Sequence, residues 1–207
     1  LQDVRFQRLG VRRMRVVVPY DVALDARGLA RYAPVLDLAR ARRVRVLPPR
    51  APGVPRTLAR GARRAGPAGV DGHVQAFRRF AKRPRIFGLH NYLDVNNFGN
   101  TSIRRLKGAT GRGAKVWLTE TGGIVRFAHT RPYDERRAAR ATRHLFRLAA
   151  QHRVARVYLY MWTGAPLGSR WDSGIVAASG RSRPALNEIE RLLGRPRTRL
   201  VSAPLEN

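Results

Sequence analysis

Several residue types and motifs are missing from this chain of 207 residues. It contains no cysteine, which excludes disulfides, thiol catalysis and cysteine-based zinc sites. No apolar run reaches about 18 residues, so we expect no transmembrane segment. The five histidines form no HExxH motif and no tight cluster with acids, so we expect neither a metal site nor a cofactor. The chain also lacks a GxSxG elbow and a glycine-rich phosphate loop, which argues against a serine hydrolase and a nucleotide-binding protein.

Acidic residues are scarce, with 13 Asp and Glu against 42 Lys and Arg, and the formal net charge is +29. Only Lys82, Lys107 and Lys115 are lysine, so the other 39 basic residues are arginine. A strongly basic chain suggests nucleic acid or anionic membranes as partners. However, the arginines spread along nearly the whole chain, which favours solvated faces. We expect non-specific adhesion to polyanions at low salt and no specific nucleic-acid partner. An Arg-rich nucleic-acid-binding protein is the alternative.

Strand-like and helix-like segments alternate along the chain, and the expected strands are apolar almost throughout. This order predicts an α/β fold with buried parallel strands, as either a barrel or a doubly wound sheet. The segment 48–69 is rich in proline, glycine and arginine, and we expect a loop or a disordered insert there. The expected strands are 11–20, 44–49, 85–92, 115–120 and 156–162, and the expected helices are 25–43, 71–82, 101–111, 134–151 and 184–194.

Polar or aromatic residues end three consecutive expected strands. His90 and Tyr92 end the first, Glu120 the second and Trp162 the third. Regular alternation would place Glu120 on the same face of its strand as Leu118. Ligands bind at the carboxyl ends of parallel strands, so these side chains are predicted to meet at one site. A carboxylate among aromatic rings suits carbohydrate chemistry, although each residue alone also fits a core, capping or salt-bridge role.

Several segments resemble the retaining glycoside hydrolases of clan A, which are (β/α)8 barrels, and in particular secreted actinobacterial enzymes of that type. GLHNYLDVN resembles their sixth strand, VWLTETGG the seventh, and LYMWTG with WDSGIV and RSRPAL the eighth strand and its loop. RFQRLGVRRMRVVVPYD resembles the approach to the second strand and that strand itself, so Arg15 matches an active-site arginine of the family. The resemblance implies a carbohydrate substrate, an extracellular location and Glu120 as the nucleophile. It implies these substrate-binding residues: Arg15, His90, Asn91, Tyr92, Trp162 and Asp172.

The resemblance also shows what is missing. The family's acid/base is a glutamate in an Asn-Glu-Pro-like motif, and none of the five glutamates lies in such a motif. Regions matching the first, fourth and fifth strands are absent, and a whole barrel takes about 250 residues. We therefore expect 1–207 to form a single, incomplete TIM-barrel-like domain with impaired hydrolysis. Asp94 or Asp172 could replace the acid, and an inactive sugar-binding remnant is the alternative. The sequence does not indicate the oligomeric state.

Overall fold

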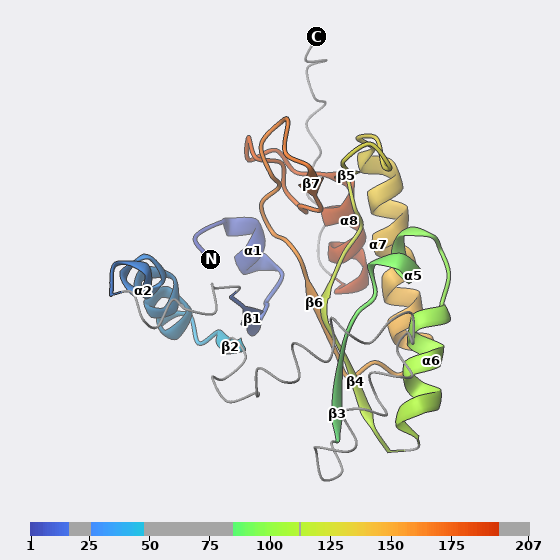
Figure 1. The fold of residues 1–207 in the computed structure, drawn as a ribbon. Helices are drawn as coiled ribbons and strands as arrows, with labels where there is room; N and C mark the ends of the chain where they lie inside the picture. The colour runs from blue at the N-terminus through green and yellow to red at the C-terminus, as the bar shows by residue number, and fades with distance from the viewer. Residues whose placement is uncertain (17–25, 48–84, 112, 195–207) are drawn as a thin grey trace. The chain divides into compact units, whose positions relative to one another are not determined.

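The computed structural model describes residues 1–16, 26–47, 85–111 and 113–194. The chain divides into two compact units, Leu1–Arg64 and Ala65–Asn207, and each is described by itself (Figure 1). Both units combine helices with parallel strands, as the sequence predicted, and the strands of the described residues do not close into a barrel. The expected insert at 48–69 and the expected helix at 71–82 lie outside the described residues. The single domain stays a prediction.

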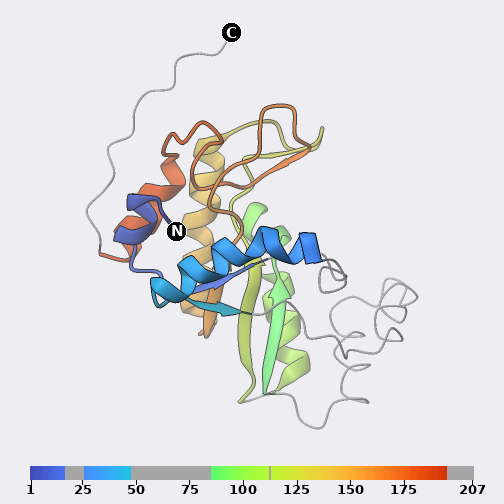
Figure 2. The same ribbon diagram turned by 90° about the vertical axis from the view of Figure 1, so that its left-hand side faces the viewer.

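The first unit is a strand–helix–strand segment preceded by a short helix. Helix α1 (Val4–Arg8) leads into β1 (Arg13–Arg15), and β2 (Arg45–Leu47) follows helix α2 (Ala26–Ala41). The strands pair in parallel, and α2 makes the crossover that such a pair requires (Figure 2). Within the expected strand at 11–20, the described residues form the three-residue strand β1. Helix α2 continues through Pro34, and its expected cap, Asp25, lies outside the described residues.

The second unit contains a parallel sheet of three strands. These are β3 (Ile86–His90), β4 (Lys115–Thr121) and β6 (Arg156–Leu159), in the order β3-β4-β6. The loops after β4 and β6 contribute a small antiparallel pair, β5 (Arg126–Phe127) and β7 (Trp171–Asp172). The carboxyl ends of β3 and β4 therefore lie at one edge of the sheet, where His90 pairs with Glu120.

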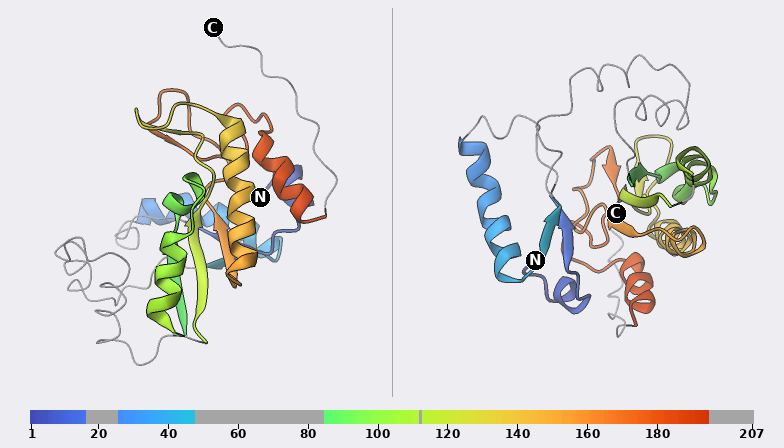
Figure 3. Two further views of the ribbon diagram at one scale, coloured as in Figure 1. Left: turned by 90° about the vertical axis from the view of Figure 1, so that its right-hand side faces the viewer. Right: turned by 90° about the horizontal axis from the view of Figure 1, so that it is seen from below.

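The described part of this unit contains the helices α5 (Tyr92–Asn96), α6 (Thr101–Thr110), α7 (Glu135–Gln151) and α8 (Pro184–Leu192). Helix α7 begins as predicted, because the Asp134 side chain accepts a hydrogen bond from the Arg137 backbone N–H at 2.8 Å. Helices α6 and α7 lie on the same side of the sheet (Figure 3). The core between these helices and the sheet contains Phe87, Val95, Leu106, Val116, Leu118, Ala141 and Leu145. No helix of the described ranges is long and apolar enough to cross a membrane.

Candidate active site

A β-bulge in β4 determines which way Glu120 faces. Leu118 pairs with Leu89 of β3, and Glu120 pairs with the next residue, His90, so Thr119 is an extra residue in β4. Paired residues of neighbouring strands share a face. Leu118 is buried in the core on the helix side, whereas Glu120 lies with His90 on the opposite face. The prediction that Glu120 shares the face of Leu118 is therefore wrong, because it assumed regular alternation.

A glycine in β3 accommodates the bulge. A Cβ atom at Gly88 would lie 3.0 Å from Thr119 Cγ2 and 3.1 Å from its Oγ1. Any larger residue at this position would therefore press against the extra residue of β4. Thr119 and Gly88 thus lie on the face that Glu120 also occupies.

The Tyr92 hydroxyl donates a hydrogen bond to Glu120 Oε1 at 3.3 Å. Tyr92 is the first residue of α5 rather than part of β3, so it reaches Glu120 from the helix that follows the strand. Burial raises the pKa of the Tyr92 hydroxyl above its ordinary value, and the negative charge of Glu120 and the hydrogen bond to it raise it further. The phenol therefore stays protonated at neutral pH and holds the carboxylate as a neutral donor.

The glycine pair after Glu120 lets the chain pass close to its neighbours. A Cβ atom at Gly122 would lie 2.8 Å from the Tyr160 carbonyl oxygen, and one at Gly123 would lie 2.0 Å from the Ala138 carbonyl oxygen of α7. The buried Asn96 side chain fixes this turn by donating to the Gly122 carbonyl oxygen at 2.9 Å. These contacts position the end of β4, and with it Glu120.

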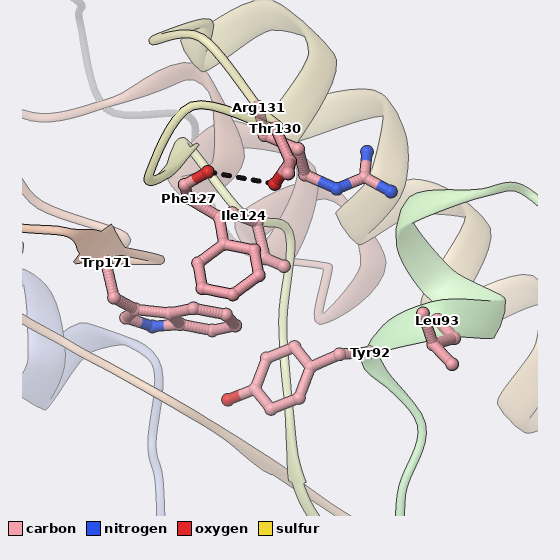
Figure 4. A pocket seen from close by; sticks show the side chains of 7 residues that line it. All are labelled: Tyr92, Leu93, Ile124, Phe127, Thr130, Arg131 and Trp171. Atoms are coloured by element: carbon pink, nitrogen blue, oxygen red, sulfur yellow. Dashed lines mark hydrogen bonds between the residues drawn. The ribbon is translucent and has the colours of Figure 1, made fainter.

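A pocket of about 260 Å³ is lined in part by Tyr92, the hydrogen-bond partner of Glu120 (Figure 4). Three aromatic rings form part of its walls: the Trp171 ring lies 4.9 Å from that of Tyr92 at 87°, and 5.2 Å from that of Phe127 at 70°. Tyr92 both lines the pocket and binds Glu120, whereas Glu120 is not itself a lining residue, so Tyr92 connects the pocket with the carboxylate. The lining residues are Tyr92, Leu93, Ile124, Phe127, Thr130, Arg131 and Trp171.

Trp171 is a candidate site residue that the sequence analysis missed. It belongs to β7, in the loop after β6, and its indole N–H donates to the Ser173 hydroxyl at 3.2 Å. That hydroxyl donates to the Tyr160 carbonyl oxygen at 2.6 Å, which fixes the indole against the end of β6. The tryptophan directly before Asp172 in the WDSGIV segment was the available signal.

The other predicted site residues lie in different environments. His90 is exposed at the end of β3 beside Glu120, and Trp162 is half-buried after β6. Asn91 is 1% exposed in the structure, and its contact with a substrate stays a prediction. Arg15 ends β1 in the first unit, and its contact with the substrate stays a prediction.

Asp172 and Asp94 both have structural partners. Asp172 Oδ1 and Oδ2 accept hydrogen bonds from Arg183 Nη1 at 3.0 Å and Nη2 at 2.7 Å, and both residues are buried. Burial alone would raise the pKa of Asp172, but the bonds from Arg183 outweigh it and hold that pKa below its ordinary value. The Asp94 carboxylate accepts 2.9 Å bonds from the Ser102 and Ile103 backbone N–H groups and so caps α6. Both carboxylates thus have structural partners, and the substrate role of Asp172 and the acid role considered for either residue stay predictions.

A charge network that the sequence analysis did not anticipate connects the start of α7 with the loop before α8. Glu135 Oε1 accepts hydrogen bonds from Arg181 Nη2 at 2.7 Å and from Arg183 Nε at 3.0 Å. Arg183 thus bridges Glu135 and Asp172, and the Tyr133 hydroxyl also donates to Glu135. Burial would raise the pKa of Glu135, but the bonds from Arg181 and Tyr133 lower it. The network therefore connects β7, which contains Trp171, to the start of α7 and to the residue before α8.

No family model matches the chain, and no curated protein matches it. Solved structures similar to it include the β-glucuronidases of an uncultured Clostridium and of Ruminococcus gnavus. The first shares 12% identity over 53% of this chain with a TM-score of 0.42, and the second 10% over 54% with a TM-score of 0.42. This chain covers only 23% and 22% of those two chains.

Another similar structure is a glycoside hydrolase family 17 β-1,3-glucanosyltransferase from Rhizomucor miehei. It shares 12% identity with a TM-score of 0.45, and the likeness covers 88% of this chain and 78% of that one. All of these likenesses are distant, so the functional proposal rests on the geometry of the site.

Proposed function

We propose that this chain is a glycoside hydrolase-like protein in which Glu120 is the nucleophile of a retaining mechanism. The observation that carries the proposal is the placement of Glu120. The bulge presents its carboxylate at the carboxyl edge of a parallel sheet, and the Tyr92 hydroxyl that holds it belongs to a ring that also lines a pocket. The site of a (β/α)8 enzyme lies at the same edge of its strands. We accordingly propose an incomplete barrel of this type, and on the sequence resemblance an extracellular location.

In the proposed reaction, one Glu120 carboxylate oxygen forms an ester bond to the anomeric carbon of the sugar. The bond from that carbon to the leaving group breaks, and the leaving group departs with the electron pair. Water then cleaves the ester, and the configuration of the anomeric carbon is retained. The aromatic rings provide flat apolar surfaces for a sugar ring, and the Tyr92 hydroxyl fixes the attacking carboxylate.

A retaining glycosidase needs a second carboxyl group about 5 Å from the nucleophile to protonate the leaving group. Asp94 caps α6 and Arg183 binds Asp172, so we propose that neither carboxyl group supplies this proton. Loss of general acid catalysis lowers the rate by about 10²–10⁴-fold. We therefore propose that Glu120 reacts readily with sugars that carry activated leaving groups and slowly with natural glycosides. The second candidate function is that of an inactive sugar-binding protein, and the pocket with aromatic residues in its lining supports it as well.

The test is covalent labelling with a panel of activated 2-fluoro glycosides, followed by intact mass measurement and peptide mapping. We expect an adduct on Glu120 with at least one sugar, because these probes need little acid assistance. Glu120→Gln should give no adduct. The matched control Glu188→Gln, which changes a glutamate that pairs with Arg143 instead, should label like the wild-type chain. A folded protein that no probe labels would overturn the nucleophile role and favour the sugar-binding candidate.

A further inference from the structure

We infer that the pocket beside Glu120 binds a sugar residue with an anionic substituent, a carboxylate or a sulfate, recognised by Arg131. This inference rests on the proposed function, because it names the class of substrate for the same site. The pocket borders Glu120 through Tyr92, so it would hold the sugar next to the one attacked. Its volume of about 260 Å³ lies near the lower end of ligand pockets and suits one sugar ring better than several.

The walls of the pocket suit the apolar face of such a ring. The Trp171 ring meets the Tyr92 ring and the Phe127 ring edge to face, and all three line the pocket (Figure 4). Aromatic side chains offer a large, rigid contact area of this kind. These walls by themselves would accept a neutral sugar as well, so the charge of the ligand depends on the polar lining.

Arg131 is the charged residue of that lining, and its partners leave its charge uncompensated. Its Nη1 donates to the Asn96 carbonyl oxygen at 3.1 Å, and its Nη2 donates to Asn97 Oδ1. Both acceptors are neutral, and among the described residues no carboxylate pairs with Arg131. A guanidinium group has five N–H donors, so about three remain for a ligand. Arg181 and Arg183 differ, because Glu135 and Asp172 pair with them.

The backbone also fixes Arg131 before any ligand binds. The Phe127 N–H donates to the Arg131 carbonyl oxygen at 3.0 Å, and the Arg131 N–H donates to the Phe127 carbonyl oxygen at 3.1 Å. The tight turn between them holds Arg131 at one side of the pocket, across from Tyr92 (Figure 4). A guanidinium held in place loses little entropy when it binds an anion, and its fork matches a carboxylate. The net charge of +29 also raises the local concentration of anionic glycans.

Binding of short oligosaccharides tests the inference by isothermal titration calorimetry at about 150 mM salt, where long-range attraction is largely screened. The probes are an oligogalacturonate, a sulfated galactose oligosaccharide and a neutral galactose oligosaccharide of equal length. We expect one anionic probe to bind more tightly than the neutral one, and the stronger of the two identifies the substituent. Arg131→Gln should weaken that binding about 10-fold or more and leave the neutral probe unchanged.

The matched control is Arg136→Gln, which removes the same charge from an exposed position of α7 outside the pocket. Equal losses in both variants, or no preference for an anionic probe, would overturn the inference. Arg131→Lys, which keeps the charge, should retain the preference in weaker form and serves if the glutamine variant does not fold. Labelling of Glu120 is measured separately. A labelled chain without anionic preference overturns this inference alone, whereas anionic preference without labelling overturns the nucleophile role alone.

Discussion

At the scale of the residue, Tyr92 serves two purposes, since its ring lines the pocket and its hydroxyl binds Glu120. Tyr92→Phe keeps the ring and removes the hydrogen bond. We expect the rate of 2-fluoro glycoside labelling to fall about 10-fold, because a hydrogen bond to a charged group contributes about 1.5–3 kcal/mol. Mass spectrometry of the labelling time course measures this rate.

Tyr133→Phe provides the matched control for Tyr92→Phe. It removes a hydroxyl that donates to Glu135 instead, so labelling should proceed at the wild-type rate. Equal labelling by the wild-type chain and Tyr92→Phe would show that the hydroxyl does not position the carboxylate.

Residue types that carry chemistry could be recognised in the sequence, but their surroundings could not. Glu120, His90 and Tyr92 do meet at the edge of the sheet, as their positions at strand ends predicted. Asp172 has the same appearance in the sequence and is buried against Arg183, which lies 11 residues further along the chain. Whether a carboxylate faces a ligand or an arginine depends on such tertiary contacts, which local patterns do not encode.

At the scale of the element, the Asp172–Arg183 pair holds the β7 loop in place. Asp172→Asn leaves a buried guanidinium without one of its counter-charges, and removing one partner of a buried pair costs about 3–5 kcal/mol. Urea unfolding at neutral pH measures this loss. The more exposed pair of Arg143 with Glu188 should contribute about 1 kcal/mol or less, so Glu188→Gln is the control. Similar losses in both variants would contradict the assigned role.

The same network predicts that the free energy of unfolding decreases at acidic pH. The pKa values of Asp172 and Glu135 are lower in the folded chain than their ordinary values. Their stabilisation is therefore complete above the unfolded pKa of about 4 and is lost as the pH falls through the lower folded values. Urea midpoints should decrease below about pH 4 in the wild-type chain, and this decrease should be smaller in Asp172→Asn. If the urea midpoints of the two proteins decreased equally with falling pH, Asp172 would not be responsible for the loss of stability.

Long helices were predictable because periodicity and capping agree. Helix α7 follows its predicted cap, Asp134, and ends at Gln151 as expected, and α6 and α8 begin at Thr101 and Pro184 as expected. The short helix α5 and the bulge in β4 were not predictable. Tyr92 has an aromatic side chain that suits a strand equally well, and the bulge depends on the pairing of β4 with β3 and on the room that Gly88 leaves.

At the scale of the whole molecule, the net charge of +29 predicts DNA binding whether or not the chain is a nucleic-acid-binding protein. The salt dependence of that binding distinguishes a glycosidase from a nucleic-acid-binding protein. We expect binding to DNA of any sequence at low salt. A protein that contacts 6–10 phosphates loses about 10³–10⁵-fold in affinity between 50 and 200 mM salt, and we expect a loss of that size. Fluorescence anisotropy with two unrelated duplexes measures it. Sequence-selective binding that persists at 200 mM salt would favour the nucleic-acid alternative.

The bulge at Thr119 also affects how this chain should be aligned with its relatives. In a regular strand, the distance along the chain determines the direction of each side chain, and one extra residue reverses it. Here Glu120 keeps its pairing with His90 despite the extra residue. A relative with one residue fewer in this strand would therefore present its carboxylate in the same place. An alignment without a gap at Thr119 would match Glu120 to the wrong residue, and the proposed nucleophile would then look absent from that relative.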